Sequence, residues 1–201
     1  VPLLTNAVAS GAEYLAELLV KSGADVNSLG GGVSPLLLAS QSGSTKLLAL
    51  LVSKGADIQT ASEAGVTPLM VLSAAGNLRG TKAHTKVVHE LIDAGASVAL
   101  RDLGGQSALG AAYDGLQAVA KYVEEALQEY ADPNDRKLGN DMLARAAGAH
   151  VEVMELLLAQ SAEPSLIDKE GNTVDATAIV ASYRALSKDV PDAADGAKDE
   201  L

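Results

Sequence analysis

One stretch of the chain decides the fold: it opens with Ser34-Pro35-Leu36-Leu37-Leu38-Ala39 and closes with Gly55-Ala56-Asp57-Ile58. Ser34 predicts a helix start, because its hydroxyl can accept a hydrogen bond from the first turn, and Pro35 suits the first helical position, where no N–H is needed. Gly43 predicts a turn, and the leucines within residues 47–51 predict a second helix that ends at Gly55. Two helices this short cannot bury their apolar faces alone, so the unit needs a neighbour on each side.

Modified copies of this unit supply the neighbours. The closing motif recurs at successive intervals of 32, 40, 35 and 31 residues. Its copies are Gly23-Ala24-Asp25-Val26-Asn27, Gly55-Ala56-Asp57-Ile58, Gly95-Ala96-Ser97-Val98, Tyr130-Ala131-Asp132-Pro133-Asn134 and Ser161-Ala162-Glu163-Pro164-Ser165. The copies of the opening motif are Ser34-Pro35-Leu36, Thr67-Pro68-Leu69 and Ser107-Ala108-Leu109.

In spacing and motif the chain resembles the ankyrin repeat family over about residues 3 to 187, since that family repeats every 33 residues or so. The resemblance implies an all-α solenoid of stacked helix-turn-helix units joined by hairpin loops. We expect one repeat domain over residues 1–187 and an acidic tail over 188–201. The expected repeats are about 1–29, 30–61, 62–101, 102–134 and 135–165, followed by a hairpin and a terminal helix, 166–187, that caps the stack.

The sequence also predicts the second helix of individual repeats. In the first repeat we expect Leu15, Leu18 and Leu19 to line the second helix. In the fourth repeat, which departs most from the pattern, we expect a separate second helix from Val119 to Leu127. The fifth repeat has its own second helix over residues 150–158.

Composition limits the function classes. The formal charge of −11 argues against a nucleic-acid partner, because phosphate contacts need clustered Lys and Arg. The simplest explanation of the acidity is the solubility of a long surface. There is no cysteine, hence no disulfide or thiolate chemistry. No stretch reaches the roughly 18 to 20 apolar residues of a membrane span, so we expect no direct membrane insertion.

The third repeat carries the largest change, an insertion of seven residues, 77–83, between its two helices. One interpretation is a tolerated surface loop. The other is a partner contact made by Arg79 and Lys82, two positive charges on an acidic protein.

The last four residues, Lys198, Asp199, Glu200 and Leu201, resemble the endoplasmic-reticulum retrieval signal. This signal works only in the lumen and with a free carboxylate, so we expect residence in the endoplasmic reticulum lumen. The alternative is an acidic tail in a protein of the cytoplasm or another organelle. The first residue, Val1, indicates either a processed precursor or a trimmed chain.

The residues do not predict an enzyme, a cofactor or a metal site. His84 and His89 are five residues apart and point to different sides of a helix, and His150 is interpreted, like His84, as a structural residue at the start of a second helix. Ser40 and Ser42 lie in no nucleophile motif. The three glycines 30–32 lack the following lysine of a phosphate loop.

The resemblance instead implies protein partners, bound at the hairpin tips and the inner face of the first helices. Either the affinity is modest or the partner supplies the aromatic anchors, because this surface offers no Trp, Tyr or Arg. A second possibility is a stoichiometric subunit of a larger organellar or membrane-associated complex, and a third is an enzyme or an enzyme-regulatory domain cut from a longer chain. The implied surface comprises Gly31, Val33, Gln41, Ser42, Glu63, Val66, Ala74, Leu103, Gln106 and Asp114, then Lys137, Glu170 and Asn172 in the last repeat and hairpin.

Overall fold

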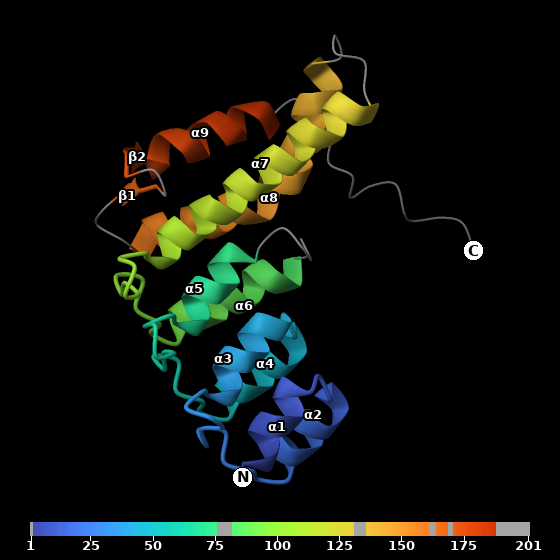
Figure 1. Cartoon of the computed structure of the whole chain (residues 1–201), viewed down its shortest axis with the longest axis vertical. Helices are drawn as coiled ribbons and strands as arrows, with labels where there is room; N and C mark the ends of the chain where they lie inside the picture. Colours follow the sequence, from blue (N-terminus) through green and yellow to red (C-terminus); the bar gives the residue numbers. More distant parts are fainter. Residues whose placement is uncertain (1, 76–81, 131–135, 161–163, 169–170, 188–201) are drawn as a thin grey trace, which may run out of the picture.

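The computed structural model describes residues 2–75, 82–130, 136–160, 164–168 and 171–187. Helices stack into an elongated body, with α1 and α2 at one end and α9 at the other (Figure 1). The helices are α1 Leu3–Ala9, α2 Glu13–Lys21, α3 Pro35–Ser42, α4 Thr45–Ser53, α5 Pro68–Ala74, α6 Lys82–Asp93, α7 Ala108–Tyr130, α8 Arg136–Gln160 and α9 Ala176–Ser187. The strands are β1 Ser165–Ile167 and β2 Thr173–Asp175.

The predicted helix starts of the second and third repeats are confirmed. The Ser34 hydroxyl accepts a hydrogen bond from the Leu37 N–H at 3.1 Å, and the Thr67 hydroxyl accepts one from the Met70 N–H at 3.3 Å. A proline follows each cap. Gly43 ends α3 with a φ of 69°, a left-handed conformation that glycine adopts without strain. Local sequence thus fixes these helix boundaries.

Stacking gives the chain one continuous core. The first helices α1, α3, α5 and α7 pack on one another in series, and so do the second helices α2, α4, α6 and α8. Leucines and valines of adjacent repeats meet between them and are fully buried, because each helix pair covers the apolar face of the next. The loops that join successive pairs lie along one edge of the stack (Figure 1).

The expected fourth and fifth repeats are wrong in their helix boundaries. Residues 119–127 are not a separate helix, because α7 continues without a break from Ala108 to Tyr130. Leu116, Val119 and Val123 are buried, so apolar residues at helical spacing favour continuation of the helix. His150 likewise lies inside α8 and not at a helix start.

Two elongated helices therefore replace two helix pairs. The packing of α7 on α5 and of α8 on α6 matches that of an ordinary repeat, and α7 also packs on α8. Thr85 of α6 reaches Glu152 in the last part of α8, so the C-terminal part of α8 stacks as a second helix does. Helices α7 and α8 thus form one helix pair of unusual length.

The predicted last hairpin and terminal helix are confirmed. Strands β1 and β2 pair antiparallel with Leu166 opposite Val174. Beside the strands, the Asn172 N–H donates to the Asp168 carboxylate at 2.8 Å. Helix α9 then packs on α8 and covers the end of the stack.

At the other end, the prediction for α2 is partly wrong. Ala16 and Val20 are the apolar residues of α2 that enter the core, whereas Leu15 and Leu18 are exposed. Leu19 is half-buried against the core, as expected. Leu15 and Leu18 are exposed because the face of α2 that carries Leu15 has no described repeat packed on it.

Candidate protein-binding surfaces

The hairpin tips form the first candidate surface, which we call the tip surface: residues 30–33, 62–66 and 102–106. Gly31, with a φ of 61°, and Gly32, with a φ of 81°, turn the first tip, and Gly30 pairs with Val33 across it. Gly31 is exposed and Val33 is half-buried. The first tip therefore offers backbone and a single aliphatic side chain.

The second and third tips are joined to each other. The Leu103 N–H donates to the Ala64 carbonyl at 2.8 Å. Gly65, with a φ of 80°, lies so close that an added Cβ would be 3.1 Å from the Cα of Asp102. Glu63 is exposed and Val66 is half-buried beside this junction. The second and third tips thus form one continuous surface.

The third tip is held from within and links to α7. The backbone N–H of Gln106 donates to the Asp102 carboxylate at 2.8 Å. The side-chain amide of Gln106 donates to Asp114 Oδ2 at 2.6 Å. The structure therefore brings together Gln106 and Asp114, two residues that the sequence placed on one surface. Leu103, at the tip itself, is 83% exposed.

The remaining expected residues lie apart from these contacts or outside the description. Gln41, Ser42 and Ala74 are exposed at the C-terminal ends of α3 and α5. Asn172 is exposed in the last hairpin. Arg79, Glu170, Lys198, Asp199, Glu200 and Leu201 lie outside the described residues, and the side chains of Lys82 and Lys137 are not described.

A second surface, a cleft of about 690 Å³ between α6 and α8, was not predicted from the sequence. Its acidic groups are already paired: His89 Nδ1 lies 2.7 Å from Asp93, and Arg184 of α9 lies 2.6 Å from Glu155. It forms where two helices distant in sequence converge, so no local signal marks it. The lining residues are Thr85, Lys86, His89, Glu90, Asp93, Glu152, Glu155, Leu156 and Ala159.

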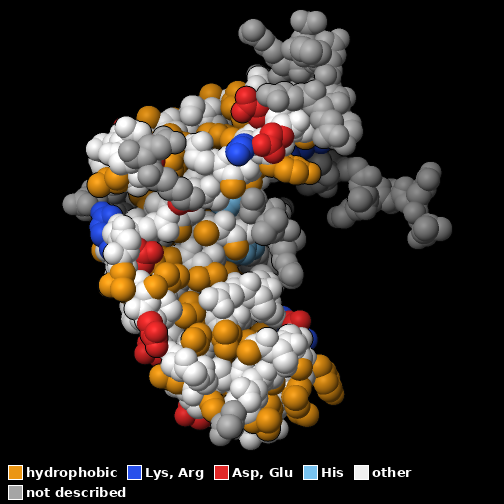
Figure 2. Space-filling model, viewed as in Figure 1, with side chains coloured by type: hydrophobic (Ala, Val, Ile, Leu, Met, Phe, Trp, Pro, Cys, Tyr) orange, Lys and Arg blue, Asp and Glu red, His pale blue; other side chains and the backbone are white. Residues whose placement is uncertain are grey.

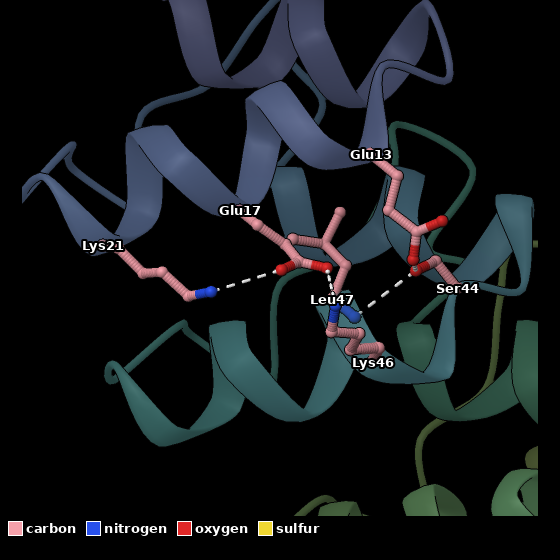
Figure 3. A network of polar contacts seen from close by, with 6 residues as sticks. All are labelled: Glu13, Glu17, Lys21, Ser44, Lys46 and Leu47. Atoms are coloured by element: carbon pink, nitrogen blue, oxygen red, sulfur yellow. Dashed lines mark hydrogen bonds and ion pairs between the residues drawn. The ribbon is translucent and has the colours of Figure 1, made fainter.

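A polar network joins the first two repeats (Figure 3). Glu17, only 8% exposed, receives Lys46 of α4 at 2.8 Å and Lys21 of its own helix at 3.3 Å. The hydrogen bond from Lys46 lowers the pKa of the Glu17 carboxyl, and Lys21 adds to this, against the opposing effect of burial. Ser44, the N-cap of α4, also donates to Glu13. The carboxylates of α2 therefore face the second repeat.

Two histidines are buried where the third repeat meets the long helix pair. His84 Nε2 lies 2.8 Å from the Leu72 carbonyl, to which it can donate, and burial lowers its pKa. Burial lowers the pKa of His150 to about 4, an effect that the nearby Ser73 backbone partly opposes and His84 reinforces. Neither His150 nitrogen has a hydrogen-bond partner of good geometry in the described part of the chain. These are structural histidines of a helix junction.

Over the described residues, no three His, Asp or Glu side chains converge as metal ligands. Within the same ranges, none of the helices combines the length and apolar character required to cross a membrane.

Comparison with known proteins agrees with the stacked helix pairs. A family model described as ankyrin repeats, in three copies, matches residues 4–102. A search of curated proteins found no match to the chain. The match covers α1 to α6 and ends at Asp102, where the third hairpin tip begins, so it spans the part of the stack whose helices have ordinary length. The family model thus finds three ankyrin repeats within residues 4–102, and the described chain as a whole is an all-α stack of helices consistent with an ankyrin-repeat solenoid.

Proposed function

We propose that this protein is a non-catalytic scaffold that binds a protein partner through the tip surface. Ankyrin repeats are protein-interaction modules in general, and the matched family model is one of such modules. The observation that carries the proposal is Leu103, which is 83% exposed on a hairpin whose backbone is held in place. An exposed apolar side chain on a backbone that is already held can serve as an anchor, because little backbone entropy is lost on binding.

The neighbouring tip supports the same conclusion. Since the Leu103 N–H is bound to Ala64, the exposed leucine keeps a fixed position relative to Glu63 and Val66. Gln106 and Asp114 hold the other side of the hairpin. A partner whose apolar pocket receives Leu103 would therefore meet the carboxylate of Glu63 on one side of the leucine. On the other side it would meet the amide of Gln106 and the carboxylate of Asp114.

The test is a comparison of two exposed residues. The full chain, tagged at its N-terminus, recovers partners from its source cells, and mass spectrometry identifies those present in stoichiometric amount. Leu103→Ala is expected to weaken capture of the principal partner about tenfold or more, the effect of losing a central anchor. Tyr122→Ala is the matched control, because Tyr122 is 72% exposed on α7, outside the tip surface. Equal capture by both variants would remove the tip surface from consideration.

We also propose a location, the lumen of the endoplasmic reticulum, on the basis of residues 198–201 alone. The proposal requires that Leu201 carry a free carboxylate in the cell. Imaging of the chain with and without Leu201 tests it, because loss of the signal should release a lumenal protein to the later secretory pathway. An unchanged location would leave the tail as a solvated acidic segment in the cytoplasm or another organelle.

The alternative function is a fixed subunit of a larger complex, and the exposed leucines at the N-terminal end of the stack favour it. A scaffold should be recovered partly free of its partner, whereas a fixed subunit should be recovered only in constant stoichiometry with the other subunits. The same purification distinguishes the two.

A further inference from the structure

The α6–α8 cleft is a groove that combines an apolar part with charged walls. Its volume is about 690 Å³, and none of its lining residues belongs to the tip surface. Leu156, half-buried, and Ala159, exposed, form its apolar part on the α8 side. Clefts of roughly 300–1,000 Å³ are typical ligand sites. The cleft can therefore receive a few side chains of a partner.

The α8 wall of the cleft carries two carboxylates that share one cation. Arg184 of α9 donates to Glu155 from two nitrogens, at 2.7 Å and 2.6 Å. These hydrogen bonds raise the pKa of the guanidinium, and the charge of Glu152 raises it further, against the opposing effect of burial. Glu152 also accepts a hydrogen bond from the Thr85 hydroxyl at 3.1 Å, which brings no charge. This wall therefore keeps negative charge.

The α6 wall carries two more carboxylates. Lys86 lies 3.6 Å from Glu90, and His89 Nδ1 lies 2.7 Å from Asp93. With histidine counted as neutral, the cleft has four carboxylates against two cations, Lys86 and Arg184. Figure 2 shows, by contrast, a face of the molecule on which acidic side chains are scattered among apolar and uncharged ones. In the cleft they are gathered around an apolar centre.

The contact between the first two repeats shows which group completes a junction of second helices. Lys46 lies nine residues before Gly55, and its ammonium reaches Glu17 of the preceding repeat at 2.8 Å (Figure 3). The residue nine positions before Ser161, where the last closing motif starts, is Glu152. The junction of α6 and α8 thus has a carboxylate where the junction of α2 and α4 has a lysine. A cation at this position of the cleft has to come from a partner.

Charge also decides against the occupants that this chain could supply. A second copy brings a formal charge of −11, and residues 188–201 contain five acidic and two basic side chains. A bare divalent cation does not fit either, because no three His, Asp or Glu side chains of the described ranges converge as ligands. The apolar part of the cleft favours a cation that is attached to an aliphatic group.

We propose that the α6–α8 cleft binds a short basic segment of a protein partner. An aliphatic side chain of the segment packs on Leu156 and Ala159, and a Lys or Arg on either side of it pairs with Glu152 or Asp93. From Thr85 to Asp93 the α6 wall is about 12 Å long, at 1.5 Å per helical residue. An extended segment of about four residues covers this distance. The inference does not depend on the proposed function of the tip surface.

The first experiment identifies the chemistry of the ligand. A library of random heptapeptides displayed on phage is selected against the full chain, immobilised through an N-terminal tag. The expected result is enrichment of sequences in which Lys or Arg stands on both sides of an aliphatic residue. Enrichment of sequences without basic residues, or no enrichment, would overturn the proposal.

The second experiment locates the peptide on the protein. The most enriched peptide, labelled with fluorescein, is titrated with the full chain and followed by fluorescence anisotropy. Ala159→Arg should weaken binding about tenfold or more, because it places a cation in the cleft. Ala118→Arg is the matched control, since Ala118 is also an exposed alanine inside a helix, in α7, and does not line the cleft. Neither change touches the core, so misfolding does not explain a difference.

A charge-removing pair completes the test. Glu152→Gln should weaken binding about threefold, the effect of losing one exposed ion pair, whereas Glu124→Gln on α7 should leave it unchanged. Higher salt should weaken binding to the wild-type chain, because exposed charges are screened. Equal effects of the two arginine variants would show attraction to the acidic protein in general. Binding that Leu103→Ala weakens and Ala159→Arg does not would place the peptide on the tip surface. Either result would overturn the proposal.

Discussion

The ammonium of Lys46 in the second repeat lies 2.8 Å from the carboxylate of Glu17 in the first, although the carboxylate is only 8% exposed. Glu17 also receives Lys21, so two cations from different repeats converge on one acid. A covered carboxylate needs such partners because burial favours its neutral form. The contact therefore joins the first and second repeats at the polar edge of their interface, whose interior consists of leucine and alanine side chains.

Lys46→Met is expected to lower the urea midpoint of unfolding, because it keeps most of the aliphatic stem and leaves Glu17 with Lys21 alone. Lys86→Met is the matched control, since Lys86 lies 3.6 Å from Glu90 of its own helix and both side chains are exposed. The difference between the variants should disappear as the pH falls below the ordinary Glu value of 4.5 and then through the lower folded-state pKa of Glu17. Equal midpoints at pH 7 would contradict the assigned role of Lys46.

Gly115→Ala has two opposite effects on the free energy of unfolding, a gain in helix propensity and a loss from steric overlap. Alanine gains about 1 kcal/mol of helix propensity in the interior of α7. An added Cβ, however, would lie 2.6 Å from the Ala74 carbonyl oxygen and 2.3 Å from Cε1 of His150. The backbone contact cannot yield by a rotamer change, so we expect a net loss of about 1–3 kcal/mol.

Gly148→Ala in α8 is the control for this prediction. No atom lies within 4 Å of its added Cβ, so only the propensity gain of up to about 1 kcal/mol should remain. Denaturant unfolding measures both variants. Stabilisation by Gly115→Ala would show that α5 and α7 are not as close as described.

His150 should make stability depend on pH. Its folded-state pKa is about 4 against an ordinary value of 6.5, so the stabilisation is complete above pH 6.5 and is lost as the pH falls toward 4. The unfolded chain takes up the proton over this window and the folded chain does not, a difference of about 3 kcal/mol. His84, whose pKa is also lowered, acts in the same direction.

His150→Leu is expected to remove this part of the pH dependence. At pH 7 the variant should be within about 1 kcal/mol of wild type, because the substitution removes two ring nitrogens that lack hydrogen bonds in the described structure. Unfolding free energies at pH 7 and pH 5 provide the measurement, with His89→Gln, an exposed change on α6, as control. Parallel pH profiles of wild type and His150→Leu would refute the prediction.

Arg184→Lys tests how α9 is held. The guanidinium makes two hydrogen bonds to Glu155, from Nε at 2.7 Å and from an NH2 nitrogen at 2.6 Å, and lysine keeps the charge but not the fork. Because both side chains are more than a third exposed, the loss should be about 1 kcal/mol or less. Hydrogen exchange should show it as faster exchange in α9, with α3 and α4 unchanged.

The residues of the tip surface could be named from the sequence because ankyrin hairpins are local structures, whereas their role in binding stays a prediction. Gln106 and Asp114 were assigned to one surface and prove to be hydrogen-bonded. The α6–α8 cleft and the Glu17 network were not predicted, since each joins residues from different repeats and depends on their relative placement.

The sequence by itself determined the helix starts at Pro35 and Pro68 and the turn at Gly43, because caps, proline and a left-handed glycine act within a few residues. Only the tertiary structure decided that residues 108–130 form one helix, although the motifs indicated the two separate helices of a fourth repeat there. It also decided that Ala16 is buried in α2 while Leu15 is exposed. In both cases the outcome depends on which neighbour covers an apolar face, and no local pattern contains that information.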